Sequence, residues 1–193
     1  MPEERPSGLI VQVALAEFNA LRGEINSRSS LAWTLVSLNL TATTTIVGFA
    51  ISNPKIWGLF LVLPLLSPAF GLLFVDHSLN IRKLGTYIQE HLGPILVREA
   101  RDEQLFQYEH WVRDYETRRV LRWVPFGIPL LLLFGGFPVT ALVLTYPTSL
   151  RLIHPTLEPA WAWGLWGGGV VLATTTLLLF VIFLASPNSF ERR

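Results

Sequence analysis

The stretch LAWTLVSLNLTATTTIVGFAISNPKIWGLFLVLPLLSPAFGLLFV (residues 31–75) decides the fold class. It contains one charged residue, Lys55, which lies in the short connection SNPK (52–55). A helix rises 1.5 Å per residue, so about 20 apolar residues cross a hydrocarbon core about 30 Å thick. The segments on either side of the connection, Leu31–Ile51 and Ile56–Val75, are long enough to do so. The sequence therefore predicts a transmembrane hairpin.

Two further stretches without charge follow, Val124–Tyr146 and Trp161–Ala185. Of the 193 residues, 51% are hydrophobic and only 15% are charged, and the mean hydropathy is +0.44. Soluble domains usually carry about 25% charged residues. We therefore predict an all-α integral membrane protein with four transmembrane helices.

The positions of arginine and lysine predict the orientation in the membrane. Residues 1–30 contain three arginines, residues 76–123 contain eight cations, and the chain ends in two arginines, whereas each short connection between spans has one cation. Cytoplasmic loops are enriched in Lys and Arg, so both termini and the central segment are expected on the cytoplasmic side of the cell membrane. The predicted parts are a cytoplasmic amphipathic helix (1–30), a first transmembrane hairpin (31–75), a cytoplasmic helical hairpin (76–123), a second transmembrane hairpin (124–185) and a cytoplasmic tail (186–193).

Apolar residues recur at helical spacing in the cytoplasmic segments. One stripe runs from Val11 to Ile25 and includes Arg22, so it is expected to lie at the membrane surface or to dock shallowly. A second stripe runs from Ile81 to Ile95, and a third from Leu105 to Tyr115. The last two are expected to pack together as the antiparallel cytoplasmic hairpin.

An acid–imidazole pair, Asp76 and His77, directly follows the second span. A helix of about 20 residues from Ile56 ends at Val75, which places the pair at the headgroup level. A solvated helix exit is therefore favoured over a proton or metal site. His110 and Asp114 lie one helical turn apart, but two such ligands without a third give a weak metal pattern. We predict no metal, no cofactor and no catalytic residue.

The first span is the most polar of the four. At 100° per residue, its hydroxyl residues and Gly48 share one face, and Asn39 lies on nearly the opposite face. Small hydroxyl residues allow close helix packing, so the stripe is expected to pack within the chain or to face a pore in an oligomer. A buried amide needs a polar partner, and self-association through Asn39 is expected to provide it. The predicted packing or pore-facing residues are Thr34, Ser37, Asn39, Thr41, Thr44, Thr45 and Gly48.

Prolines and glycines interrupt the other spans, and kinks are expected there. The predicted kink positions are Pro64 and Pro68 in the second span, and Phe134, Gly135 and Pro138 within FGGFP (134–138) in the third. In the fourth span, GLWGG (164–168) predicts a small-xxx-small helix contact through its first and last glycines. Anchoring to lipid is predicted for Arg118, Arg119, Arg122, Trp161 and Trp163.

The segment AEFNALRGEINSRSSLAWTLVSLNLTATTTIVGFAI (16–51) resembles the start of bacterial multi-pass membrane proteins of actinomycete type. Those proteins pair an E-[FY]-N-A-L-R-x-E-I-x-x-R helix with a membrane hairpin, and the resemblance implies no activity. The matching residues are Glu17, Phe18, Asn19, Ala20, Leu21, Arg22, Glu24, Ile25 and Arg28. In architecture alone, the chain is similar to the two-span SLATT effectors of bacterial conflict systems, from which it departs by two further spans.

These patterns predict a small, non-enzymatic inner-membrane protein. It is expected to self-associate, or to bind an unidentified membrane or cytoplasmic partner, through its transmembrane helices, as an effector or a pore. The net charge of +1 gives no basic face for nucleic acid, and the absence of cysteine excludes disulfides and thiolate chemistry. Two alternatives stay open: a transporter or accessory subunit for a neutral solute, and a membrane-interface enzyme in which Asp76, His77 and His110 converge.

Overall fold

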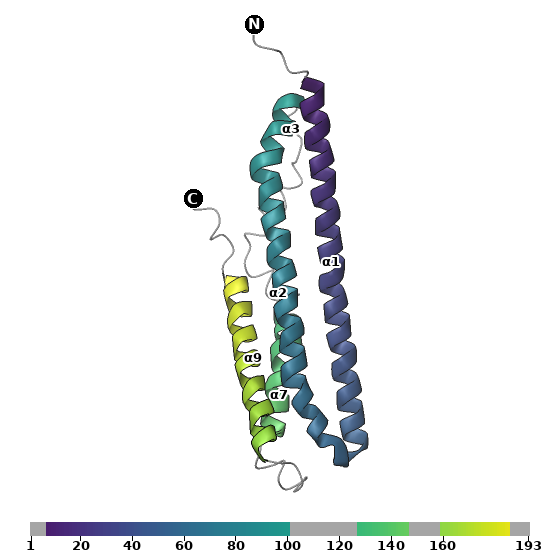
Figure 1. Cartoon of the computed structure of the whole chain (residues 1–193), viewed down its shortest axis with the longest axis vertical. Coiled ribbons are helices and arrows are strands. Elements are labelled where there is room, and N and C mark those ends of the chain that lie inside the picture. The colour runs from purple at the N-terminus through teal and green to yellow at the C-terminus, as the bar shows by residue number, and fades with distance from the viewer. Residues whose placement is uncertain (1–6, 101–126, 147–158, 186–193) are drawn as a thin grey trace. The chain divides into compact units, whose positions relative to one another are not determined.

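The computed structural model describes residues 7–100, 127–146 and 159–185, and every element in these ranges is a helix (Figure 1). The prediction of an all-α protein is confirmed for this part of the chain. The elements are α1 (Ser7–Ser52), the 3₁₀-helix η1 (Pro54–Val62), α2 (Leu63–Tyr87), the π-helix η2 (Ile88–Leu92), α3 (Gly93–Ala100), α6 (Ile128–Leu131), the π-helix η4 (Leu132–Gly136), α7 (Phe137–Leu144) and α9 (Pro159–Ala185).

Three helical stretches are long and apolar enough to cross a membrane, namely Gly8–Ser52, Gly58–Glu99 and Trp163–Ile182. A fourth stretch, Ile128–Leu144, is apolar but shorter. At 1.5 Å per residue it reaches about 25 Å. The long helices have the length and composition of membrane-spanning segments.

The connection between the first two apolar segments is tight, as the SNPK stretch predicted. Helix α1 ends at Ser52, and Asn53 alone separates it from η1, with its N–H donating to the carbonyl of Phe49 at 3.0 Å. The second apolar segment nevertheless begins as a 3₁₀-helix and becomes α-helical only at Leu63. Pro64 is the second residue of α2, and a proline is tolerated in the first turn of a helix because an N–H there has no acceptor within that helix.

The described residues form two compact units, and α1 and α2 each contribute to both. Unit 1 contains residues 7–32 and 77–100. Unit 2 contains residues 33–76, 127–146 and 159–185.

Unit 1 is a pair of helical segments with a small apolar core. Ala14 of α1 is buried against Ile88 and Leu92 of η2. Around them pack Phe18, Leu21, Ile25, Ile95 and Leu96. The first predicted stripe thus packs on the second, while the third stripe lies outside the described residues. Arg22 lies within the first stripe, and its charge is accommodated by a cation–π contact, since its guanidinium lies 5.2 Å from the centre of the Phe18 ring.

A hydrogen bond also joins the two segments of unit 1. The Tyr87 hydroxyl donates to Glu17 Oε1 at 2.8 Å. This bond, together with the negative charge of Glu17, raises the pKa of Tyr87 above its usual 10.0, because both disfavour the tyrosinate. Because folding raises this pKa, the pairing of Tyr87 with Glu17 stabilises the folded state below pH 10, and this contribution is lost as the pH rises through the folded-state pKa of Tyr87.

The Glu17→Gln variant is therefore expected to move the titration midpoint of Tyr87 down towards 10. Ultraviolet absorption of tyrosinate measures it, with the Tyr87→Phe protein subtracted. Glu24→Gln is the matched control, because Glu24 accepts a hydrogen bond from Arg28 Nε at 2.6 Å and is expected to leave the midpoint unchanged. Equal midpoints in the two glutamine variants would contradict the pairing of Tyr87 with Glu17.

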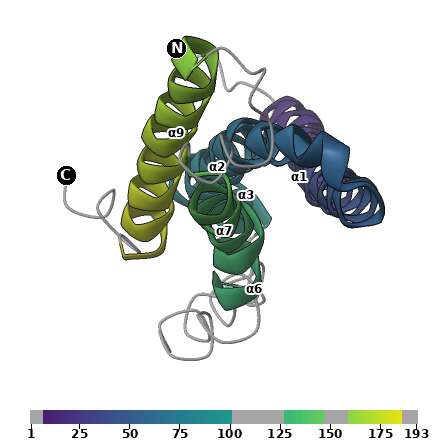
Figure 2. The same ribbon diagram turned by 90° about the horizontal axis from the view of Figure 1, so that it is seen from below.

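Unit 2 is a helical bundle with an aromatic centre. Figures 1 and 2 show α7 beside α9, and these two helices are in contact. The rings of Phe74 (α2), Phe134 (η4) and Phe180 (α9) lie with their centres 5.7–6.2 Å apart. A second cluster joins Ala50, Phe60, Leu63 and Ala141, with Ile46 and Val47 packed against it.

Both π-helices end two residues before a proline, Pro94 in unit 1 and Pro138 in unit 2. The residue preceding each proline donates its N–H to the carbonyl five positions earlier: Gly93 to Ile88, and Phe137 to Leu132. A proline in an α-helix has no N–H and its ring collides with the carbonyl four positions earlier. The wider π-turn moves that carbonyl away. The interruption predicted at FGGFP (134–138) thus takes the form of a π-helix, whereas α2 continues through Pro68.

Candidate functional site

A chain of buried hydrogen bonds joins three helical elements of unit 2. Asn39 of α1 donates through Nδ2 to Ser67 Oγ of α2 at 2.9 Å. Ser67 in turn donates to the carbonyl of Leu133 in η4 at 3.0 Å. The Asn39 and Ser67 side chains are completely buried, with 0% exposure. We call these three groups the polar cluster.

The π-helix explains why Ser67 is needed. The carbonyl of Leu133 would accept from Phe137 in an α-helix or from Pro138 in a π-helix. The Phe137 N–H already donates to Leu132, and Pro138 has no N–H. In lipid, a carbonyl without a donor costs several kcal/mol. The Ser67 hydroxyl supplies that donor, and since its hydrogen is used there, the Asn39 amide must present its NH₂ to Ser67.

Close helix contacts surround the polar cluster. Thr176 of α9 donates to the carbonyl of Pro68 at 3.2 Å. A Cβ on Gly71 would meet Thr176 Cγ2 at 2.8 Å and Phe134 Cβ at 3.1 Å, and a Cβ on Gly169 would meet Pro64 Cβ at 2.9 Å. These two glycines therefore allow α2 to approach η4 and α9.

The contact predicted for α9 is shifted by one residue. A Cβ on Gly164 would meet nothing within 4 Å, and one on Gly168 would reach only Leu65 Cδ2, at 3.7 Å. Gly169 makes the close approach instead. The reason is that Pro64, which has no flexible side chain to move aside, faces α9 at this point.

Asn39 has its polar partner inside the chain, which corrects the expectation of self-association through this residue. It lies on the face of α1 opposite the hydroxyl stripe, as the 100° spacing predicted, and that face packs against α2. The amide that requires a donor or acceptor in lipid finds one in Ser67. A second copy of the chain is not needed to give its NH₂ group an acceptor.

The hydroxyl stripe of α1, by contrast, does not pack within the described chain. All six of its members are exposed, namely Thr34, Ser37, Thr41, Thr44, Thr45 and Gly48. Ser37 and Thr41 donate their hydroxyls to the carbonyls of Trp33 and Ser37, at 3.1 and 2.9 Å. These two hydroxyls are thus satisfied within α1. We call this surface the hydroxyl face.

Thr43 differs from the other buried hydroxyl residues of the unit, namely Ser67, Thr145 and Thr176, which are all hydrogen-bonded. It lies one turn beyond Asn39 on the buried face and is 3% exposed. Its Oγ1 has no hydrogen-bond partner within the described structure, and neither has Oδ1 of Asn39. Two buried polar atoms on adjacent turns of one helix are therefore left unpaired.

Comparisons with known proteins give no match. No family model matches the chain, and no curated protein or solved structure does so either. The resemblances noted around EFNALR (17–22) remain predictions. Two features of unit 2 are left as the basis for a function, the polar cluster and the hydroxyl face.

The remaining candidate residues do not assemble into a site in the part of the chain described. Helix α2 continues through Asp76 and His77, of which Asp76 is exposed and His77 is half-buried with an unpaired Nδ1. No group of three or more metal-ligating side chains occurs among the described residues. The other residues of these predictions, namely His110, Asp114, Arg118, Arg119 and Arg122, lie outside the described ranges.

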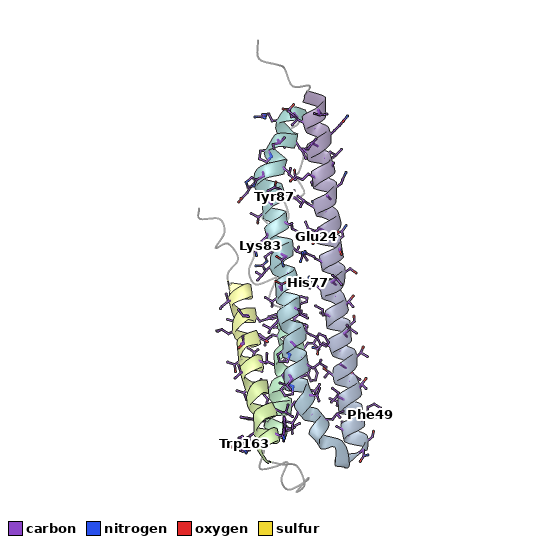
Figure 3. All side chains as sticks on the ribbon, viewed as in Figure 1. Glu24, Phe49, His77, Lys83, Tyr87 and Trp163 are labelled. Atoms are coloured by element: carbon purple, nitrogen blue, oxygen red, sulfur yellow. The ribbon has the colours of Figure 1, made fainter. Side chains whose placement is uncertain are left out.

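Aromatic residues gather at one end of unit 2. Figure 3 shows Phe49 of α1 and Trp163 of α9 at the same end of this unit. Tyr146, Trp163 and Trp166 pack edge to face with ring centres 5.6–6.0 Å apart, and Trp161 is 71% exposed. Exposed tryptophans at one level of a helical bundle are typical of a membrane–water interface. The anchoring of Trp161 and Trp163 to lipid stays a prediction.

Proposed function

We propose that this chain is a non-enzymatic membrane protein that self-associates through the hydroxyl face of α1 and acts as an effector or pore. The observation that carries this proposal is the division of α1 in unit 2. Asn39, Thr43 and Ala50 are buried on one face, and every member of the hydroxyl face is exposed on the other. The bundle thus buries one face of α1 and leaves the most polar surface of this helix outside.

The energetics of helix association in lipid favour this surface. Lipid tails are as apolar as leucine, so helices associate through close packing and hydrogen bonds rather than by the hydrophobic effect. The hydroxyls of Ser37 and Thr41 are occupied within α1. Association is therefore expected to rest on the small size of these side chains, which lets two backbones approach.

We further propose four spans with both termini and residues 76–123 in the cytoplasm. The short apolar stretch Ile128–Leu144 supports a third span because its last part, α7, packs against α9 and η1 within unit 2. The C-terminal end of α1 and the N-terminal end of α9 lie at the same end of the unit (Figure 3). That arrangement agrees with an outward first span and an inward fourth span, and with the distribution of arginines.

Bulk added to the hydroxyl face is expected to break the self-association. In the Thr41→Leu/Thr45→Leu double variant, two branched side chains would hold the helices apart. The dissociation constant is expected to rise about tenfold or more, which is about 1.4 kcal/mol. Sedimentation equilibrium or single-molecule photobleaching in lipid nanodiscs and bilayers at several protein-to-lipid ratios measures it.

Val171→Leu is the matched control, because it adds a methylene on α9 at a residue that is 65% exposed. It is expected to associate as the wild type does. A wild-type chain that stays monomeric at every protein-to-lipid ratio would overturn the proposal. So would a double variant that associates as tightly as the control.

One observation favours a second candidate, passage of a neutral solute. Asn39 Oδ1 and Thr43 Oγ1 are unpaired polar atoms inside a bundle whose predicted spans contain no Asp, Glu, Lys, Arg or His. Neutral solutes are bound in membranes by such amide and hydroxyl groups. Proteoliposome swelling with small polyols, compared between the wild type and Asn39→Leu, tests this candidate: equal swelling rates would remove it.

A further inference from the structure

We propose that Asn39 and Thr43 form a binding site for one water molecule inside unit 2. The water donates to Oδ1 of Asn39 and accepts from the hydroxyl of Thr43. The site takes small neutral molecules that both donate and accept hydrogen bonds. It does not depend on self-association, because both residues lie on the face of α1 that packs within the chain.

The first argument concerns the Thr43 hydroxyl. Hydroxyl groups on the helices of unit 2 commonly donate to the carbonyl four residues earlier, as Thr41, Thr140, Thr145 and Thr174 do at 2.6–2.9 Å. Thr145 does so even though it is only 2% exposed. Thr43 is equally buried, yet its Oγ1 makes no such bond. Its hydroxyl is free to donate elsewhere.

The second argument concerns the oxygen of Asn39. The Ser67 hydroxyl donates to Leu133 and accepts from Asn39 Nδ2, so it has no hydrogen left for Oδ1. Rotating the amide by 180° would place Oδ1 against Ser67 without a hydrogen between them. Asn39 Oδ1 is therefore an acceptor that requires a donor from outside the polar cluster.

The third argument is distance. Side chains four residues apart on a helix have Cβ atoms about 5–6 Å apart. Two hydrogen bonds of about 2.8 Å that meet at the tetrahedral oxygen of one water join atoms about 4.5 Å apart, a separation within reach of the ends of two side chains on adjacent turns. Buried waters typically bind groups that the protein itself leaves unsatisfied. A water is the smallest molecule that can donate to Asn39 and accept from Thr43 at once.

Water-edited solid-state NMR of the full chain in lipid bilayers tests this site. Magnetisation transfer from water is expected at the Asn39 side-chain amide and the Thr43 side chain. It is expected to be absent at Thr176, a threonine with 1% exposure whose hydroxyl already donates to Pro68. In Thr43→Val, the transfer to Asn39 is expected to fall at least about twofold, whereas Thr43→Ser keeps it.

The melting temperature gives an independent readout. Removing a hydroxyl that is hydrogen-bonded to the water leaves that water with one partner fewer, so Thr43→Val is expected to lower the melting temperature by about 2–4 °C. An unpaired hydroxyl would give a higher melting temperature, and one bonded back to its own helix would leave it unchanged. Either of those results, or the absence of water transfer to Asn39 in the wild type, would overturn the proposal.

Discussion

Replacing Ser67 by alanine is expected to lower the free energy of unfolding of unit 2 by about 2–4 kcal/mol, because it leaves two buried polar groups without their hydrogen-bond partner. The carbonyl of Leu133 loses its donor, and the amide of Asn39 loses its acceptor. Each buried polar group left without a partner costs about 1–3 kcal/mol. Unfolding in sodium dodecyl sulfate followed by tryptophan fluorescence measures the change. Ser52→Ala is the matched control, since the Ser52 hydroxyl donates to Gly48 at 2.8 Å on an exposed surface.

The cause assigned to Ser67 can be tested by a second substitution. Pro138→Ala supplies an N–H at the position where the backbone donor for Leu133 is missing. If Ser67 exists to serve that carbonyl, Ser67→Ala should cost less in the Pro138→Ala background, by about 1 kcal/mol or more. A Ser67→Ala effect no larger than that of Ser52→Ala would contradict the polar cluster. Strict additivity of Ser67→Ala and Pro138→Ala would contradict the role of the proline.

The polar cluster shows where prediction from the sequence stops. The 100° spacing placed Asn39 opposite the hydroxyl stripe, and the requirement that a buried amide be paired predicted a partner for it. The identity of that partner could not be predicted. Ser67 is needed because Pro138 has no N–H to donate to the carbonyl of Leu133, and Leu133 lies 66 residues after Ser67 in the sequence. No local pattern around Ser67 carries that information.

Prolines illustrate the same limit in another form. An interruption could be predicted at Pro64, Pro68 and Pro138, because a missing N–H is a property of the residue itself. The form of the helix around each proline could not be predicted, because the missing N–H can be accommodated in several ways. Here it is accommodated by a 3₁₀-helix before Pro64, by a continuous α-helix through Pro68 and by a π-turn before Pro138. Packing of neighbouring helices decides among them, and it involves residues distant in the sequence.

Contacts made through glycine depend on the neighbouring helix as well. A small-xxx-small pattern predicted a contact through Gly164 and Gly168 in α9, whereas Gly169 makes the close approach, because the pattern does not say which residue of the other helix is rigid. Pro64 of α2 lies opposite Gly169, so Gly169 is the residue of α9 that must be small. Gly71 forms a small-xxx-small pair with Ser67 in α2, and it is the residue at which α2 lies against both η4 and α9.

Gly71→Leu is accordingly expected to lower the free energy of unfolding of unit 2 by about 3 kcal/mol, the upper end of the usual cost of overpacking. The Cβ alone would lie 2.8 Å from Thr176 Cγ2 and 3.1 Å from Phe134 Cβ, so the longer side chain has no room unless the helices separate. Gly164→Leu makes the same change where a Cβ meets nothing within 4 Å, and it is expected to cost less than about 0.5 kcal/mol. Both are measured by the same unfolding experiment.

A smaller change at the same place separates steric overlap from other effects of the substitution. Gly71→Ala adds only the Cβ, and Thr176→Ser removes the Cγ2 that this Cβ would meet while keeping the hydroxyl that donates to Pro68. The double variant is therefore expected to be more stable than the sum of the two single changes predicts, because the serine makes room for the alanine. If Gly71→Leu and Gly164→Leu cost the same, α2 does not approach α9 this closely. If the effects of Gly71→Ala and Thr176→Ser are strictly additive, the Cγ2 of Thr176 is not what excludes a larger side chain at position 71.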